Sequence, residues 1–235
     1  MSINRISAIF IKEVQDLRKN KNIIYMYFIP ILLTLIWDKI VVEMPDIAAL
    51  GFGLMFLVVM VGIYVPSMLI SEEKEKHTME VLLLSPASPS EVFIGKGLMT
   101  FLSILVTSVV IVMIVNTSFS ILGIIFLGTV LISLFSITLG MIVGVLAPNQ
   151  MSTGIIGLPV YLILLLIPNF AMMGNELMLR LAKVLPTYYY LDMLDIAYND
   201  GGGLGNMTGN IFIIIGSTIL AFIVLLGVFR KKGLE

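Results

Sequence analysis

Long apolar stretches separated by short polar segments dominate the pattern along the chain. A helix needs about 20 predominantly apolar residues to cross the hydrocarbon core of a bilayer, and six stretches reach that length. They cover residues 23–42, 47–70, 97–116, 120–147, 151–172 and 210–229. The pattern therefore predicts an all-α membrane protein, with residues 1–235 forming a single transmembrane domain of six helices.

The composition also indicates that lipid surrounds much of the chain. Hydrophobic residues make up 59% of the chain and charged residues 12%, whereas soluble domains have roughly 45–50% and 25%. A soluble fold of this size could not bury so much apolar surface, so lipid must cover much of it. The net charge of −1 gives no indication of a nucleic-acid partner, and the absence of cysteine excludes disulfides and thiolate metal sites.

Lys and Arg residues are distributed unequally between the segments that connect the spans. With six spans, both termini lie on the same side as residues 71–96 and 148–150. Of the 14 Lys and Arg residues, this side holds all except Lys39, Arg180 and Lys183. Since cytoplasmic segments carry the excess of basic residues, we expect a multi-pass protein of the cell (plasma) membrane with both termini in the cytoplasm.

The N-terminal segment, residues 1–22, has apolar residues at helical spacing. They are Ile3, Ile6, Phe10, Val14 and Leu17, and most of the charged residues fall between them. This periodicity predicts an amphipathic helix that lies in the membrane interface. The alternative is an ordinary charged leader before the first span.

The sequence predicts a short apolar helix within the connection formed by residues 71–96. Thr78 is a suitable N-cap, and Glu80 stands in the first turn, where the helix dipole favours an anion. The helix covers residues 79–84 and stops before Pro86. A second helix start follows, because Ser88, Pro89 and Glu91 form a capping box that leads into the third span.

The connection formed by residues 173–209 is rich in aromatic residues. Pro186 precedes a tyrosine run, residues 188–190, and the apolar pattern continues from there. Tyrosine suits the interface between lipid and water. We therefore expect short outer helices between the fifth and sixth spans.

Several chemical functions lack the residues that they need. The only Gly-Lys pair, Gly95-Lys96, has Ser90 in place of the first glycine of a phosphate-binding loop and Gly97 in place of its Ser or Thr. The single histidine, His77, cannot form an intramembrane metal site. The spans hold almost no ionisable residues at mid-membrane, which argues against an ion-coupled carrier. We therefore expect no enzyme activity, no catalytic or metal-binding residues and no cofactor in this chain.

Small residues recur every four positions in the fourth span, at Ser136, Gly140 and Gly144. This spacing lets two helix backbones approach closely. The pattern predicts packing inside the subunit, with a seam between two copies as the alternative.

The first long connection also carries a family motif. Residues 73–86 read Glu-Lys-Glu-Lys-His-Thr-Met-Glu-Val-Leu-Leu-Leu-Ser-Pro, and Gly95-Lys96 follows. This stretch resembles the E-[RK]-E-x-G-T-x-E-x-L-L-x-[ST]-P motif of the membrane subunits of type-2 ABC transporters (ABC-2 permeases). His77 replaces the usual glycine. The resemblance extends over the whole chain, including the N-terminal helix, the six spans and the tyrosine-rich segment before the last span.

The resemblance implies how such a chain would work. Residues 79–84 would be a coupling helix that docks on a separate ABC ATP-binding subunit, which supplies ATP and Mg. The residues implied in coupling are Glu73, Glu75, Thr78, Met79, Glu80, Leu82, Leu83 and Pro86. An outer gate or interface segment would contain Pro186, Tyr188, Tyr189 and Tyr190. A second copy of the chain, or a paralogous permease, would complete the working unit in the lipid bilayer.

The resemblance implies an exporter, and the sequence favours an amphipathic or hydrophobic cargo, such as a peptide, an antibiotic or a lipid-like molecule. It has no large soluble insertion that could hold a hydrophilic polymer, and its spans carry methionine, which adapts to varied apolar surfaces. One alternative is a membrane sensor or immunity anchor that transports nothing. Another is a member of the same family that exports sodium or glycans.

Overall fold

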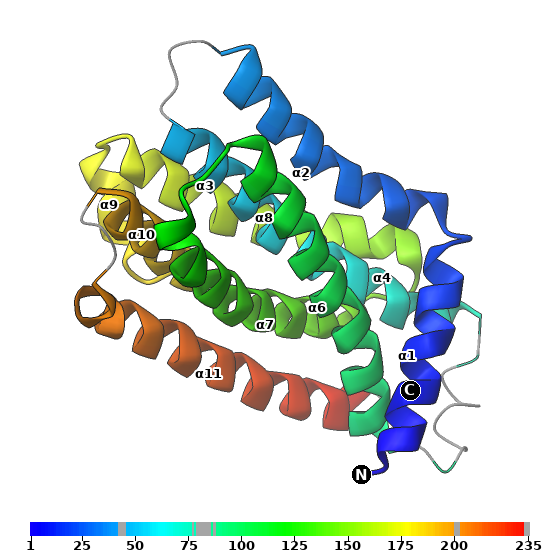
Figure 1. Ribbon diagram of the computed structural model, residues 1–235. Helices are drawn as coiled ribbons and strands as arrows, with labels where there is room; N and C mark the ends of the chain where they lie inside the picture. The colour runs from blue at the N-terminus through cyan, green and yellow to red at the C-terminus, as the bar shows by residue number, and fades with distance from the viewer. Residues whose placement is uncertain (42–45, 77, 79–85, 87, 200–202, 233–235) are drawn as a thin grey trace.

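The computed structural model describes residues 1–41, 46–76, 78, 86, 88–199 and 203–232, and all regular elements among them are helical (Figure 1). They are α1 (Ile3–Leu17), α2 (Lys21–Lys39), α3 (Asp46–Phe56), η1 (Leu57–Val61), α4 (Gly62–Glu75), α6 (Pro89–Ile114), η2 (Phe119–Ile121), α7 (Leu122–Leu146), α8 (Gln150–Met172), α9 (Glu176–Ala182), α10 (Pro186–Asn199), η3 (Leu204–Met207) and α11 (Thr208–Lys232).

Among the described residues, six helices are long and apolar enough to cross a membrane. They are Lys21–Lys39, Ile47–Glu75, Pro89–Ile114, Phe119–Leu146, Gln150–Met172 and Gly205–Lys232. The predictions of an all-helical membrane protein, of six such helices and of short helices before the last one are confirmed. The second is a run of α3, η1 and α4, in which η1 is a π-helical turn.

Capping residues fix where several of these helices begin. The side chains of Asn20 and Asn149 accept backbone N–H groups at the starts of α2 and α8. At the start of α6, the Ser88 side chain accepts the N–H of Glu91, and the Glu91 carboxylate accepts the N–H of Ser88. This is the capping box that the sequence predicts.

The elements divide between two ends of the bundle. Figure 1 places the N-terminus, α1, the start of α6 and the end of α11 at one end, and α9 and α10 at the other. The ends of α4 and α7 meet at the first of these, where the Nζ atom of Lys74 lies 2.8 Å from the carbonyl oxygen of Val145. We call it the termini end. The helix ends that flank the two connections predicted to share a side with the termini, residues 71–96 and 148–150, therefore lie at this end, and the side of the membrane that it faces stays a prediction.

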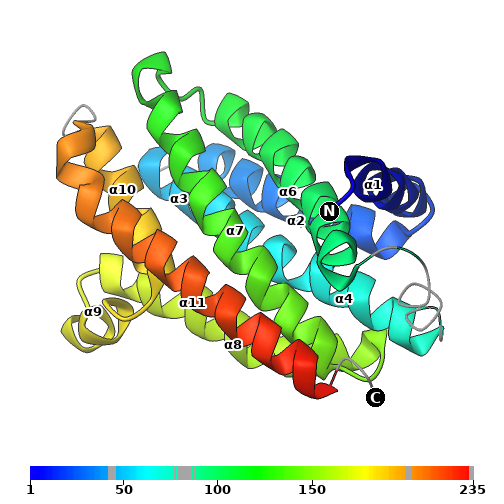
Figure 2. The same ribbon diagram turned by 90° about the horizontal axis from the view of Figure 1, so that it is seen from below.

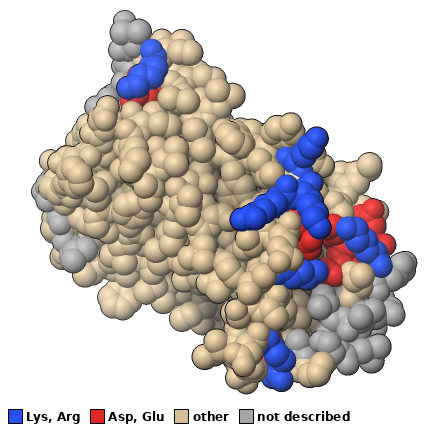
Figure 3. Space-filling view, turned by 45° about the vertical axis from the view of Figure 1, so that its right-hand side comes forward, with Lys and Arg blue, Asp and Glu red and all other residues tan. Residues whose placement is uncertain are grey.

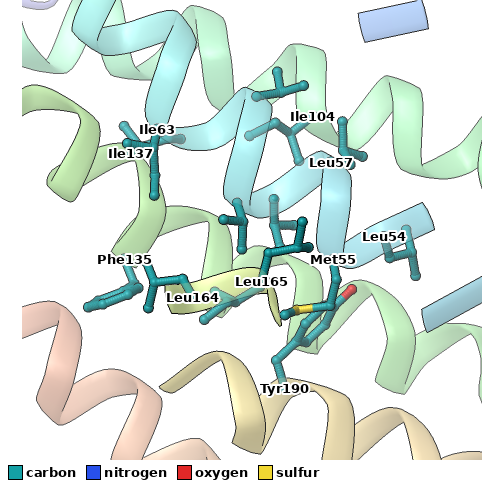
Figure 4. Packing of buried hydrophobic residues seen from close by; sticks show 14 of the residues in the cluster. Leu54, Met55, Leu57, Ile63, Ile104, Phe135, Ile137, Leu164, Leu165 and Tyr190 are labelled. Atoms are coloured by element: carbon teal, nitrogen blue, oxygen red, sulfur yellow. The ribbon is translucent and has the colours of Figure 1, made fainter. Parts of the chain in front are cut away.

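Helix α7 lies at the centre of the bundle and contacts α4, α6, α8, α10 and α11. Figures 1 and 2 show α11 running alongside α7. Apolar side chains from several helices pack into the core beside α7, among them Met55, Ile63, Leu165 and the fully buried Tyr190 (Figure 4).

The small residues of α7 face α4. A Cβ atom added to Gly140 would lie 2.3 Å from the carbonyl oxygen of Ile63, and one added to Gly144 would lie 2.8 Å from that of Ser67. Ser136 faces the first residue of α4, because a Cβ atom added to Gly62 would lie 2.9 Å from the Cβ atom of Ser136. These distances leave no room for a side chain, so the predicted stripe packs two helices of the same subunit together.

Candidate functional site

The connection between α4 and α6 carries the coupling residues predicted from the sequence. Of these, Met79, Glu80, Leu82 and Leu83 lie outside the described residues. Thr78 and Pro86 are described, and so are the helix ends from which the connection leaves and to which it returns. The site can therefore be built from these helix ends and from α1, which packs along α6.

Lys96 is the centre of a buried group of charges at this end. Its Nζ atom donates to Glu13 at 2.7 Å, to Glu73 at 3.0 Å and to the backbone carbonyl of Leu69 at 3.3 Å. The three N–H bonds of the ammonium group are thus all used. Lys96 is only 1% exposed, and the three acceptors come from α1 and α4. One side chain of α6 therefore joins three helices.

Glu73 extends this group toward the connection. One carboxylate oxygen accepts from Lys96 and Lys12, and the other accepts the hydroxyl of Thr78. Glu73 is 5% exposed, so its carboxylate faces the interior of the subunit. Thr78, the predicted N-cap, is bonded back to α4; its capping bonds would involve residues outside the described ones.

The group is formally neutral, with Lys12 and Lys96 balancing Glu13 and Glu73. We call these four residues the ion cluster. Burial lowers the pKa of Lys12, but its hydrogen bond to Glu73 and the nearby Glu13 and Asp16 raise it by more. Lys12 therefore stays protonated. Because a buried charge is tolerated only when it is paired and hydrogen-bonded, the cluster is stable only while all four side chains are in place.

A second link joins α1 to the start of α6. The Glu91 carboxylate accepts from the backbone N–H of Ser2 at 2.6 Å and from the Arg5 guanidinium at 2.8 and 2.9 Å. It also accepts the N–H of Ser88, as part of the capping box. The hydrogen bond to Glu91 raises the pKa of Arg5 above its ordinary value. One carboxylate therefore caps α6 and holds the first turn of α1.

This second link gives a test of how α1 is held. Replacing Glu91 by alanine removes the acceptor of Ser2, Arg5 and Ser88 at once, so the first turn of α1 should separate from α6. Trypsin added to membranes should then cleave after Arg5 faster than in the unchanged chain, and the melting temperature should fall.

The matched control is Glu72→Ala. Glu72 pairs with Lys76 on the surface of α4, and an exposed pair of this kind adds little stability. Equal cleavage after Arg5 in Glu91→Ala and Glu72→Ala would show that other contacts hold α1.

A cleft lined mainly by charged residues opens between α1 and α4 at the ion cluster and encloses about 280 Å³. It is lined by Lys12, Glu13, Asp16, Leu69, Glu72, Glu73, Lys76, Thr78 and Lys96. Figure 3 shows basic and acidic side chains gathered together at one side of the molecule, while most of the visible surface lacks charge. Many charged side chains of the described residues thus lie close to the point where the α4–α6 connection begins.

Glu75 differs from Glu73 in its surroundings. It is exposed, and its carboxylate accepts the backbone N–H of Gln150 at 3.0 Å. Together with the bond from Lys74 to Val145, this contact ties the end of α4 to the turn between α7 and α8. Glu75 therefore lies on the surface next to the connection, where a partner can reach it.

The predicted outer segment lies at the opposite end of the bundle and starts α10. Pro186 is the first residue of α10. The hydroxyl groups of Tyr190 and Thr129 are 2.9 Å apart, which joins α10 to α7. Tyr189 donates to the carbonyl of Lys183 at 2.8 Å. The three tyrosines do not form one surface, because Tyr190 is fully buried whereas Tyr188 and Tyr189 are partly exposed.

Residues 19–227 match the sequence model of a family described as "ABC-2 family transporter protein". The chain belongs to the ABC-2 transporter family. A search of the curated proteins gives no match. The family match includes α2 to α10 and most of α11, and begins after α1. The ion cluster of this ABC-2 protein thus joins the matched region to a helix that precedes it.

Glu73 and its partner Thr78 are among the site residues predicted from the sequence of this ABC-2 protein, whereas its partners Lys12 and Lys96 and the neighbouring Glu13 are not. A signal was present for Glu13, which stands three residues after Phe10 and four before Leu17, on the apolar stripe of the predicted helix. A charged residue at such a position indicates an internal partner. Lys96 was noticed only as part of a Gly-Lys pair, and nothing local shows that it faces α1.

Proposed function

We propose that this ABC-2 protein is the membrane subunit of an ATP-driven exporter that moves an amphipathic or hydrophobic cargo out of the cell. The observation that carries the proposal is the braced arrangement of α1, α4 and α6 around the start of the α4–α6 connection. Lys96 and Glu91 each join α1 to α6, and Lys96 also joins both to α4. A force applied at the connection would therefore reach three helices together.

The source of that force would be a separate ABC ATP-binding subunit. Residues 79–84 would dock on it as a coupling helix, and Glu75 and Pro86 would lie at the margins of the contact. Glu73 would act indirectly, because it faces Lys96 and Thr78 rather than a partner. ATP and Mg would bind only to the partner, since this chain has no phosphate-binding loop.

The complete transporter would contain two membrane subunits, either two copies of this chain or this chain with a paralogous permease. The termini end would face the cytoplasm, because it carries most of the Lys and Arg residues. The opposite end, with α9, α10 and the tyrosine segment, would then face outward and form part of the gate. Methionine-bearing apolar helices suit an amphipathic or hydrophobic cargo.

The proposal predicts that the isolated chain does not hydrolyse ATP. Co-expressed with its ABC ATP-binding subunit and reconstituted into liposomes, the chain should co-purify with that subunit and change its ATPase rate when cargo is added. An assay of phosphate release measures ATP hydrolysis both by the isolated chain and by the reconstituted complex. Turnover by the isolated chain, free of contaminants, would contradict the assignment, and absence of any partner ATPase would favour the sensor or immunity anchor.

The orientation can be tested separately, since the chain contains no cysteine. Single substitutions Ser90→Cys and Gly203→Cys lie at opposite ends of the bundle, and both positions are exposed. In intact cells an impermeant maleimide should label Gly203→Cys but not Ser90→Cys, and permeabilised cells should show both. Labelling of Ser90→Cys in intact cells would overturn the proposed orientation.

A further inference from the structure

We infer that Lys96 is a positioning residue: through the ion cluster it holds α1 on α4 and α6, so that α1 moves as one body with the start of the α4–α6 connection. The inference rests on the proposed function for its consequence, which is transmission of movement from the ATP-binding subunit. Its structural part, the clamping of α1 by Lys96, stands on the contacts alone.

Helix α1 is attached to α6 at two separate places. Its first turn is held by Arg5 on Glu91, and its third turn is held by Glu13 on Lys96. Eight residues separate Arg5 from Glu13, which corresponds to about 12 Å along a helix. A helix fixed at one point can pivot, whereas a helix fixed at two points this far apart cannot. α1 is therefore held in orientation as well as in place.

Close packing between the two attachments supports the clamp. A Cβ atom added to Gly95 would lie 2.7 Å from the Cγ2 atom of Ile9 and 3.3 Å from the carbonyl oxygen of Ile6. The backbones of α1 and α6 thus approach so closely that a side chain at Gly95 fits only if Ile9 is made smaller and the two helices open slightly. This fit depends on α1 staying in register with α6, and the neighbouring Lys96 fixes that register through Glu13.

The ion cluster is also linked to the α4–α6 connection itself. Glu73 accepts from Lys96 with one oxygen and from Thr78 with the other. Removing the Lys96 charge would leave Glu13 and Glu73 with only Lys12, whose side chain is 46% exposed. The cluster would then hold a net negative charge in a buried place. The two carboxylates would repel each other, which would separate α1 from α4 and release Thr78.

The clamping can be measured in the chain alone by crosslinking. The double variant is Ile9→Cys/Gly95→Cys. Cysteine is smaller than isoleucine, so position 9 gains room for the sulfur added at position 95. Because the two positions lie against each other, a disulfide can form once α1 and α6 open slightly. Oxidation in membranes should form this bond readily. Adding Lys96→Met should reduce its rate of formation by about tenfold or more, because a buried ion pair has lost its partner.

The matched control is Lys76→Met, which removes a lysine from the same cleft. Among the described residues, the ammonium group of Lys76 pairs with the surface residue Glu72. Lys76→Met should leave the crosslinking rate unchanged. Equal crosslinking rates with and without Lys96→Met would overturn the inference, since α1 would then be held without Lys96.

The consequence for coupling is measured with the co-expressed ABC ATP-binding subunit. Lys96→Met should lower cargo-stimulated ATPase activity, and oxidation of the Ile9→Cys/Gly95→Cys pair in the same chain should restore it, with loss again on reduction. If Lys96 merely stabilised the fold, the variant would lose yield and melting temperature, and the disulfide would not restore coupling in the protein that remains.

The two proposals fail in different ways. If the unchanged chain neither binds nor stimulates an ATP-binding subunit, the proposed function is wrong, while the crosslinking result still decides the role of Lys96. If the unchanged chain stimulates ATP hydrolysis and Lys96→Met does so equally well, the inference is wrong and the proposed function stands.

Discussion

Replacing Glu80 by lysine is expected to abolish cargo-stimulated ATPase activity and export together, while the chain still inserts into the membrane. Glu80 stands in the first turn of the proposed coupling helix, where an acid stabilises the positive end of the helix. A lysine there opposes the helix dipole and presents the wrong charge to a basic contact on the partner. In a desolvated interface this penalty reaches several kcal/mol, or more than a hundredfold in affinity.

The control for this substitution is Glu176→Lys. Glu176 is also a first-turn acid, in α9 after the N-cap Asn175, but it lies at the opposite end of the bundle. It therefore reports the effect of the helix dipole without a partner. Glu91 is unsuitable as a control, because its carboxylate is engaged by Ser2, Arg5 and Ser88. Co-purification and stimulated ATPase activity at the unchanged level in Glu80→Lys would show that coupling occurs elsewhere.

Replacing Gly140 by leucine is expected to prevent the bundle from assembling. The first atom of any side chain at this position would lie 2.3 Å from the carbonyl oxygen of Ile63 and 2.6 Å from Pro66. The contact is with backbone, which cannot move aside without displacing α4 from α7. Overpacking of this kind costs typically about 1–3 kcal/mol for one or two added methylene groups and more where backbone must shift.

Gly123→Leu is the matched control, because it makes the same change in the same helix where nothing lies within 4 Å of the added atom. Detergent-solubilised protein can be compared by size-exclusion chromatography and thermal melting. Gly140→Leu should yield aggregated protein, and the smaller Gly140→Ala should melt at a lower temperature than the unchanged chain. A monodisperse Gly140→Leu protein with an unchanged melting temperature would refute the close packing of α7 on α4.

The features that could be predicted from the sequence are those determined by residues close to one another along the chain. Each span is a continuous apolar stretch, and its existence depends only on the length and hydropathy of that stretch. The capping box of Ser88 and Glu91 depends on residues three positions apart. The glycine stripe of α7 repeats every four residues, and its use inside the subunit followed once α4 was found beside it.

The features that could not be predicted join residues that are distant in the chain. Glu13 and Lys96 are 83 positions apart, and Thr129 and Tyr190 are 61 apart. For the pair of Glu13 and Lys96, nothing in either neighbourhood specifies the partner, because many charged residues at the termini end would satisfy the same electrostatic need. The π-helical turn η1 (Leu57–Val61) also has no local signal, since the sequence around it reads as uniformly apolar.

The distance along the chain between α1 and its attachment points sets an order of events during synthesis. Glu91 and Lys96 are made after two spans have already been translated, so α1 cannot form these two attachments while those spans enter the bilayer. Until then Glu13 lacks its bond to Lys96, so its carboxylate must stay in contact with water or lipid headgroups. The first helix to be synthesised therefore takes its final position only after the third span has been made.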